Sequence, residues 1–201
     1  MADIFEKSRD NLRSKMSNFI EDPIVSLMIK LKISPNFVTV SGFALILISV
    51  LLISQGMFRS AGLFIFTSGF LDIFDGALAR KTGLENSKGA FLDSVLDRLS
   101  ESLVLLGIIY FFSLGDGNIW IVMLASLSLV FSIMISYLRA RIEGLGLNSK
   151  GGIFTRPERV FVVCVGLTFF TPLVTMIVLT TGVLIGFVHR FIIFWNLLRE
   201  E

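Results

Sequence analysis

Cysteine and histidine are nearly absent from this sequence, with one residue of each among 201. The lone Cys164 lies in an apolar segment and cannot form an internal disulfide, so it does not indicate a redox compartment and is interpreted as a packing residue. The first residues contain no continuous apolar segment, so a cleaved signal peptide is not expected. Charged residues are also scarce, at 17% of the chain. Those that fall inside apolar segments therefore need an explanation.

Apolar residues dominate the rest of the chain. Hydrophobic residues make up 54%, twenty residues are Phe, and the mean hydropathy is +0.81, which indicates an integral membrane protein. Because a span needs about 20 apolar residues, the sequence predicts an all-α fold with six transmembrane helices. We expect one domain, residues 1–201, with a six-helix bundle over 37–196. The predicted spans are 37–55, 60–81, 88–113, 118–140, 157–171 and 173–196. Pro172 either separates the last two spans or kinks one long helix.

The segment before the first span, residues 1–32, has an amphipathic pattern. Its apolar residues recur mostly at three- and four-residue steps, while Lys and Arg occupy other faces. This pattern predicts a helix that lies along the membrane surface. Asp22 and Pro23 form a helix-start signal that restarts this helix midway. A solvated helix without a membrane role is the alternative.

The distribution of basic residues predicts the orientation. Nearly all Lys and Arg fall in four regions that share one side of a six-span protein, or at the helix ends beside them: residues 1–36, 82–87, 141–156 and the C-terminus. The turns on the other side contain only Arg59. By the positive-inside rule the basic side is cytoplasmic. We therefore expect a multi-pass protein of the cell membrane, with both termini inside.

Four carboxylates lie at helical spacing in two of these apolar segments: Asp72, Asp75, Asp93 and Asp97. Each ionised group in hydrocarbon costs roughly 2.5–3.5 kcal/mol, so the cluster needs compensation. If the helices on either side of residues 82–87 form an antiparallel hairpin, the two pairs face each other at matching depth, roughly 10 Å below the cytoplasmic surface. The sequence thus predicts a polar pocket just inside the membrane.

Divalent cations are the natural counter-charge for this cluster. Carboxylate ligands without Cys or a nearby His favour Mg²⁺ or Mn²⁺ over zinc, and two ions would suit phosphoryl transfer. Gly76 and Gly89 beside the carboxylates either permit close helix packing or let a substrate approach the backbone. Arg80 at the helix end either binds a phosphate or extends to the membrane surface.

These residues resemble a known family. Asp75-Gly76, Ala79-Arg80, Gly89, Asp93 and Asp97 match every fixed position of the D-G-x2-A-R-x8-G-x3-D-x3-D signature of the CDP-alcohol phosphotransferases. Asp72 stands where that family has an additional leading aspartate. Six spans and an N-terminal surface helix are also similar to the family. Its members join a CDP-activated lipid to an alcohol and release CMP.

The resemblance implies roles for individual residues. Asp72, Asp75, Asp93 and Asp97 would bind two divalent ions, and Asp97 would also be the catalytic base toward the acceptor hydroxyl. The CDP group would be bound by Asp72, Gly76, Ala79, Arg80 and Gly89. A homodimer is implied as well, although no GxxxG motif on an otherwise free face of a span indicates one independently. No nucleic-acid partner is expected.

A second group of charged residues bears on the acceptor. Arginines cluster at two helix ends, and Arg190 lies within the last span beside His189. Positive-inside anchoring explains some of them, but arginines that converge on the metal pocket would suit an acceptor with its own phosphate. The branch of the family that uses inositol phosphate has segments similar to two in this sequence, S-Y-x-R-A-R-x-E-G-L-G and R-P-E-R. This resemblance assigns the acceptor phosphate to Arg141, Arg159 and Arg190, with Arg139 and Arg156 as further candidates.

Several alternatives remain open at this stage. Glycerol 3-phosphate as acceptor would make the protein a phosphatidylglycerophosphate synthase. A cation transporter could also use an intramembrane carboxylate cluster, but the outer halves of the spans are nearly all apolar and offer no polar path across the membrane. A purely structural membrane protein is a further alternative, but it would not explain why four carboxylates lie in apolar segments. The sequence does not distinguish CDP-diacylglycerol from CDP-archaeol as the lipid donor, nor Mg²⁺ from Mn²⁺.

Overall fold

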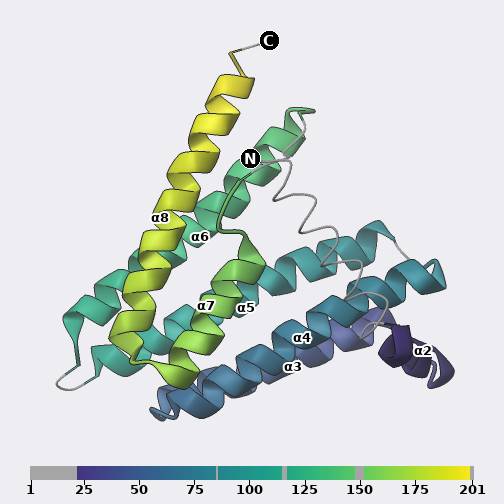
Figure 1. The fold of residues 1–201 in the computed structure, drawn as a ribbon, viewed down its shortest axis with the longest axis horizontal. Coiled ribbons are helices and arrows are strands. Elements are labelled where there is room, and N and C mark those ends of the chain that lie inside the picture. Colours follow the sequence, from purple (N-terminus) through teal and green to yellow (C-terminus); the bar gives the residue numbers. More distant parts are fainter. Residues whose placement is uncertain (1–21, 85, 115–116, 148–151, 200–201) are drawn as a thin grey trace.

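The computed structural model describes residues 22–84, 86–114, 117–147 and 152–199. This part of the chain contains seven helices and no strand (Figure 1). In order they are α2 (Asp22–Lys30), α3 (Pro35–Ser54), α4 (Phe58–Thr82), α5 (Ser87–Ser113), α6 (Ile119–Gly144), α7 (Arg156–Phe169) and α8 (Pro172–Leu197). The all-α prediction is confirmed for these residues. Most of the predicted surface helix over 1–32 lies outside them.

Helix boundaries coincide with local stop and start signals. Gly83, with φ 64°, ends α4 in the left-handed conformation that glycine adopts readily. The side chain of Asn86 then accepts a 2.8 Å hydrogen bond from the amide of Gly89 and caps the start of α5. The predicted break at Pro172 is confirmed, because α8 begins at this proline and Thr171 caps it.

Four helices are long and apolar enough to cross a membrane: α3, α4, α6 and α8. Large apolar side chains are exposed around the bundle, including Phe91 at 72% and Phe169 at 75%. Exposed apolar surface on this scale is typical of contact with lipid and unfavourable in water. The protein is therefore a helical membrane protein. In the described residues α5 and α7 do not meet the same criterion, since α5 carries several charges and α7 has only 14 residues.

The helices share a common end. The C-terminal ends of α3, α5 and α7 and the N-terminal ends of α4, α6 and α8 gather at the lower left of Figure 1. At the opposite end, α6 and α8 point away from α3, α4 and α5 (Figure 1). A single core of apolar residues connects the helices, and it includes Ile53, Ile65, Ile108, Leu167 and Leu179. A smaller cluster around Val25 and Leu78 packs α2 against α4.

The arrangement of α4 and α5 differs from the predicted hairpin. Helix α3 packs against both of them, whereas α4 and α5 make few contacts with each other, and α4 packs instead on α7. The four-residue connection between α4 and α5 still brings their carboxylates to the same region. The two helices thus form opposite walls of a polar space, and the N-terminus of α7 lies between them.

Candidate active site

The core of the candidate site is a group of three aspartates from two helices. Asp72 and Asp75 lie on one face of α4, and Asp93 lies near the start of α5. One carboxylate oxygen of each lies within 4.8 Å of the others. Asp75 is buried, and the Oδ1 atom of Asp93 is buried without a hydrogen-bond partner among the described residues. Three converging oxygens, one of them unpaired, fit a hard divalent cation.

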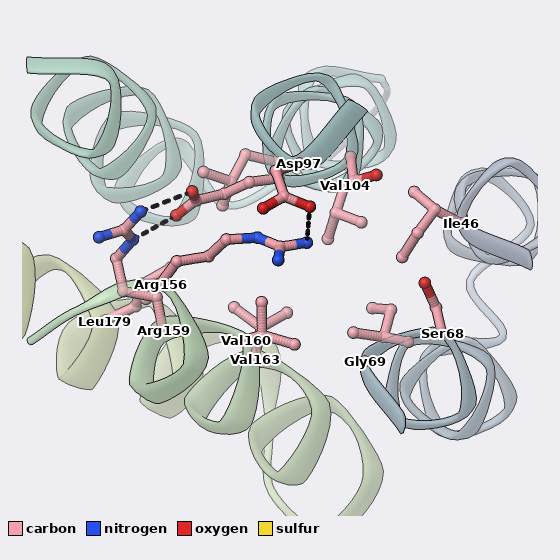
Figure 2. A pocket seen from close by; sticks show the side chains of 14 residues that line it. Ile46, Ser68, Gly69, Asp97, Val104, Arg156, Arg159, Val160, Val163 and Leu179 are labelled. Atoms are coloured by element: carbon pink, nitrogen blue, oxygen red, sulfur yellow. Dashed lines mark hydrogen bonds and ion pairs between the residues drawn. The ribbon is translucent and has the colours of Figure 1, made fainter. Parts of the chain in front are cut away.

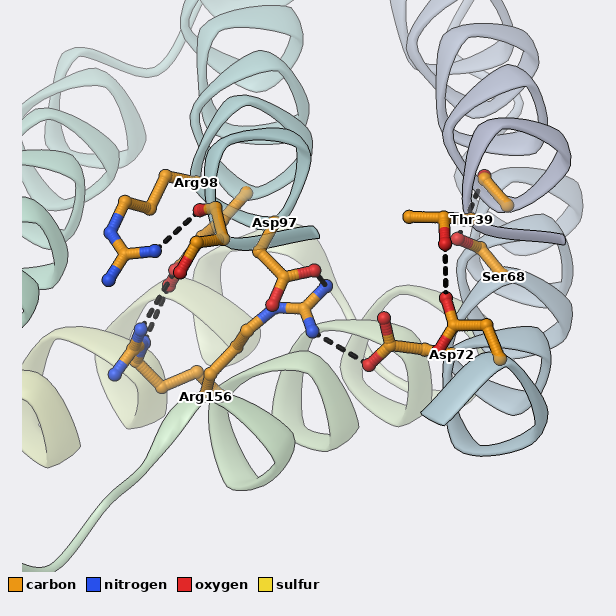
Figure 3. Close-up of polar contacts among 11 residues, drawn as sticks. Thr39, Ser68, Asp72, Asp97, Arg98 and Arg156 are labelled. Atoms are coloured by element: carbon orange, nitrogen blue, oxygen red, sulfur yellow. Dashed lines mark hydrogen bonds and ion pairs between the residues drawn. The ribbon is translucent and has the colours of Figure 1, made fainter. Parts of the chain in front are cut away.

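Thr39 on α3 holds one of these carboxylates. Its hydroxyl donates a 2.7 Å hydrogen bond to Oδ2 of Asp75 and lies 3.1 Å from the carbonyl of Pro35 (Figure 3). The bond to Asp75 leaves the second oxygen of that carboxylate for another ligand. Sequence analysis did not identify Thr39, because no local spacing relates it to residues 36 positions away on another helix.

Asp97 joins the group through an arginine. Arg156, the first residue of α7, donates to Oδ2 of Asp72 at 2.8 Å and to Oδ1 of Asp97 at 2.7 Å. Figure 3 shows its guanidinium between the two carboxylates. Arg156 therefore connects α4 to α5 at the start of α7. The helix begins there with a capping box between Thr155 and Glu158, which fixes the direction of the α7 N-terminus.

One turn beyond Asp97, a fifth carboxylate on the same face of α5 forms a buried ion pair. The Nε and Nη2 atoms of Arg159 lie 2.6 and 2.9 Å from the two carboxylate oxygens of Glu101. Figure 2 shows the two parallel contacts beside Arg156. The pair is almost completely enclosed, with side-chain exposures of 3% for Arg159 and 12% for Glu101. Sequence analysis missed Glu101, although its spacing of four residues from Asp97 extends the D-x3-D pattern.

A pocket of about 320 Å³ connects these carboxylates to the arginines. Four predicted arginines line it together with two aspartates: Arg139, Arg156, Arg159, Arg190, Asp93 and Asp97. Arg190 is 6% exposed, and its Nε atom has no hydrogen-bond partner among the described residues. Arg139 is exposed and pairs with Glu143 at 2.9 Å. Arg141 is exposed at the end of α6 and does not line this pocket.

Two further pockets adjoin the same residues. The pocket in Figure 2 extends from Asp97 and Arg156 into the bundle, between apolar side chains such as Ile46, Val104 and Val163. A smaller one lies between α3, α4 and α5 and is lined by Thr39, Asp72, Asp75 and Asp97, among others. The Asp97 carboxylate thus borders both the pocket lined by arginines and the pocket lined by apolar side chains.

The residues expected to bind CDP lie at the open end of α4 and α5. Gly76 follows Asp75 directly, and a side chain at this position would approach the Nη1 atom of Arg80 to 3.4 Å. Arg80 itself is exposed, and Ala79 is half-buried. At Gly89 on α5, an added Cβ would lie 3.4 Å from the side-chain oxygen of Asn36. The small residues therefore leave the backbone accessible beside the acidic group.

A helical membrane bundle with a carboxylate cluster beside a pocket rich in arginines fits the class of enzymes that act on phosphate-bearing substrates with a divalent cation. Comparison with protein families agrees: residues 32–188 match the model of the CDP-alcohol phosphatidyltransferases. The chain belongs to this family, and it is a transferase of phospholipid synthesis. The family resemblance derived from the signature is thereby confirmed.

Individual relatives cover most of the chain. The phosphatidylinositol phosphate synthase of Mycobacteroides abscessus is 32% identical over 151 residues, which are 75% of this chain and 69% of that protein. The archaetidylinositol phosphate synthase of Methanothermobacter thermautotrophicus is 32% identical over 166 residues, or 83% of this chain and 80% of that protein. Both are synthases of inositol phosphate lipids by name.

Solved structures are similar as well. The phosphatidylinositol phosphate synthase of Mycobacterium tuberculosis in complex with manganese and citrate superimposes with a TM-score of 0.79 at 30% identity, covering 88% of this chain and 89% of that one. The same enzyme with CDP-DAG bound gives a TM-score of 0.76, also at 30% identity, covering 86% and 92%. These relatives support a divalent metal at the carboxylate group of this chain.

Proposed function

We propose that this protein transfers a phosphatidyl or archaetidyl group from a CDP-activated lipid to inositol phosphate and releases CMP. The single observation that carries this proposal is the pocket whose lining combines Asp93 and Asp97 with arginines from four helices, among them Arg156 and Arg190. The aspartates suit the metal-bound diphosphate of the donor, and the arginines suit an acceptor that brings its own phosphate. The relatives named for the same two activities, with ester and ether lipids, support this choice.

The four aspartates are the proposed ligands of two Mg²⁺ or Mn²⁺ ions. Asp72, Asp75 and Asp93 already converge, and Asp97 reaches the same region through its contact with Arg156. Bound divalent ions would neutralise the diphosphate and stabilise charge on the leaving CMP. Thr39 would hold Asp75 in its ligating orientation.

Asp97 is the proposed general base. It lines the acceptor pocket, and its Oδ1 atom is held by Arg156, which leaves Oδ2 to accept the proton of the acceptor hydroxyl. The hydroxyl oxygen forms a bond to the phosphorus that carries the lipid, the bond from this phosphorus to the CMP oxygen breaks, and the proton passes to Asp97. Arg156 would keep the carboxylate oriented during this step.

The acceptor phosphate is proposed to bind at the arginines of the pocket. Arg190 is the strongest candidate, because its largely buried guanidinium lines the pocket and forms no ion pair with a carboxylate of the described residues. Arg159 is already paired with Glu101, and Arg156 with two aspartates, so both contribute to the pocket with part of their charge balanced. Arg139 contributes at the exposed rim. Arg141 could take part only from outside this pocket.

The nucleotide of the donor is proposed to bind at the open end of α4 and α5. The proposed binding residues are those of the family signature in this region: Asp72, Gly76, Ala79, Arg80 and Gly89. The donor diphosphate would then lie between this region and the carboxylates, while its lipid chains extend into the membrane. CDP-diacylglycerol and CDP-archaeol carry the same nucleotide and diphosphate, so this part of the site serves either.

We also propose that all six helices α3 to α8 cross the membrane. Helix α7 spans only about 21 Å, less than the hydrocarbon core of about 30 Å. Its first residue, Arg156, contacts Asp72, which precedes the end of α4 by ten residues or about 15 Å. Helix α7 therefore begins at the depth of the site, and we propose that residues 152–155 before it extend the crossing toward the basic side. With six crossings, both termini and the site lie on the basic, cytoplasmic side of the cell membrane.

A homodimer is the proposed assembly, on the basis of the family resemblance. Light scattering of the purified protein in detergent would give a protein mass near twice 22.4 kDa. A mass of a single chain at micromolar concentration would contradict this part of the proposal.

The decisive test is CMP release by the purified protein with a CDP-lipid and Mg²⁺. Inositol phosphate should support release, whereas free inositol and serine should not. Release with glycerol 3-phosphate alone would retain the metal site and overturn the choice of acceptor. If no acceptor supports release and CDP-lipid does not bind, the proposed donor is wrong and ion transport needs to be assayed. The family membership does not favour that alternative.

A further inference from the structure

A phenylalanine in the segment before α7 is packed into a glycine notch on α8. The ring of Phe154 lies so close to Gly182 that an added Cβ there would be 2.3 Å from the ring Cζ atom. One turn along α8, a Cβ on Gly186 would be 3.0 Å from the carbonyl oxygen of Ile153 and 3.1 Å from the Cβ of Phe154. Gly182 and Gly186 form a GxxxG motif, a pattern that often brings two membrane helices together. Here that face of α8 is covered by residues 153 and 154 of the same chain.

The backbone of Phe154 is held in an unusual conformation. Its φ of 56° lies in the left-handed region, which bulky residues rarely adopt and which persists only when the surroundings enforce it. Its carbonyl oxygen accepts a 3.3 Å hydrogen bond from Nη1 of Arg159, and Arg159 is in turn fixed by the buried ion pair with Glu101. The ring is thus held by α8 and the carbonyl by α7 and α5.

The same segment supports the arginine of the acceptor pocket. An added Cβ on Gly152 would lie 2.6 Å from both Nε and Nη2 of Arg190, so the backbone of Gly152 lies directly against the guanidinium. Gly152 has a φ of 120°, which excludes most other residues. On its other side, the Nη1 atom of Arg190 lies 3.5 Å from the carbonyl of Ile135 on α6. Two backbone segments therefore define where this guanidinium can lie.

We infer that Phe154 and the Gly182–Gly186 notch are positioning elements for the acceptor phosphate. The ring anchors residues 152–155 on α8, and this anchoring places Gly152 against Arg190 and Thr155 and Arg156 at the wall of the pocket. None of the three anchoring residues lines the pocket. Their contribution is indirect, through the orientation of the arginines. This inference rests on the proposed function, because it takes the phosphate of the acceptor as the group that these arginines bind.

The test separates acceptor binding from general stability. Steady-state kinetics of CMP release are measured for the unaltered protein, Phe154→Ala and Gly182→Ala, varying inositol phosphate and CDP-lipid in turn. Both variants should raise the KM for inositol phosphate about tenfold, because a weakened charged hydrogen bond from Arg190 to the acceptor phosphate changes affinity by about this factor. The KM for CDP-lipid should change less than twofold. Gly144→Ala is the matched control, since nothing lies within 4 Å of a Cβ there.

A double variant tests the contact itself. Gly182→Ala adds a methyl group where the ring of Phe154 lies, and Phe154→Leu removes part of that ring. If the two positions act together, the double variant should recover part of the acceptor affinity lost in Gly182→Ala, which independent sites would not do. Phe154→Leu alone also serves as the milder substitution if Phe154→Ala does not remain monodisperse in detergent.

The outcomes are distinguishable. An unaltered KM for inositol phosphate in stable Gly182→Ala and Phe154→Leu variants overturns the inference, and so does an equal rise in the KM of both substrates. If the unaltered protein releases no CMP with inositol phosphate, the proposed function fails first, and the assignment of the phosphate fails with it. A selective rise for the acceptor together with recovery in the double variant supports the inference.

Discussion

The hydroxyl of Thr39 is hydrogen-bonded to the carboxylate of Asp75 at 2.7 Å, across 36 positions of the sequence. The contact ties α3 to α4 at the depth of the carboxylate group. It also occupies one acceptor position of the Asp75 carboxylate and restricts the rotation of that group, which favours one direction for the approach of a metal ion. Loss of a group that orients a metal ligand in this way typically lowers metal affinity or activity by about 10- to 100-fold.

Thr39→Val should therefore weaken Mn²⁺ binding by about tenfold, the lower end of the range for such outer groups. Valine keeps the shape of threonine and removes only the hydroxyl, and Thr39→Ser should retain most of the affinity. Binding is measured by electron paramagnetic resonance of free Mn²⁺, without turnover. Thr67→Val is the matched control, because among the described residues that hydroxyl donates only to the Leu63 carbonyl in its own helix. Equal affinity of Thr39→Val and the unaltered protein would remove Thr39 from the site.

Glu101→Gln should lower the free energy of unfolding by about 3 kcal/mol, since it leaves the charge of Arg159 buried and unpaired. Replacing both partners, as Glu101→Leu with Arg159→Met, should restore most of the stability because no unpaired charge remains. Unfolding is followed by circular dichroism in mixed micelles. The exposed pair of Arg139 and Glu143 provides the comparison: Glu143→Gln should cost less than about 1 kcal/mol. Similar losses for both single variants would contradict a special role of the buried pair.

Asp97→Asn should reduce the rate of CMP release by at least about 10²-fold, the lower limit for loss of a general base. The amide is of the same size and can still contact Arg156 through its oxygen, so the fold should be retained. Gel filtration and CDP-lipid binding of the purified variant establish that it is intact. Substantial residual turnover would show that Asp97 is not the base.

Much of this architecture can be derived from the sequence, since the cost of charges in hydrocarbon makes the four aspartates conspicuous. The helix ranges and the break at Pro172 follow from apolar run lengths and from proline chemistry. The packing order does not follow in the same way: the hairpin of α4 and α5 was expected to be direct, whereas α3 packs against both helices. A single sequence contains no local signal that shows which other helix packs against both α4 and α5.

The same limit applies to individual site residues. Thr39 and the Phe154 contact with α8 depend on long-range packing, so no spacing rule identifies them. Glu101 could have been found from its four-residue step beyond Asp97, because residues at this spacing share a helix face. Arg141 and Arg139 are only two positions apart on α6, yet only Arg139 lines the pocket. The two side chains point to different faces of α6, because successive residues are rotated about the helix axis.

Arg190→Gln should raise the KM for inositol phosphate at least about tenfold while the KM for CDP-lipid stays within twofold, since a lost charged hydrogen bond costs about 1.5–3 kcal/mol. The expected selectivity follows from the position of Arg190, which lines the acceptor pocket and is absent from the other two pockets. Arg190→Lys should recover only part of the loss, because an ammonium group cannot replace the planar, two-pronged guanidinium.

Two further substitutions make this prediction specific. Arg59→Gln removes an exposed arginine at the far end of α4 and should leave both KM values unchanged. Arg141→Gln should have a clearly smaller effect than Arg190→Gln, because Arg141 lies outside the pocket. If Arg141→Gln weakened inositol phosphate binding as strongly as Arg190→Gln, the acceptor would bind at the exposed end of α6, and the buried guanidinium of Arg190 would need another explanation.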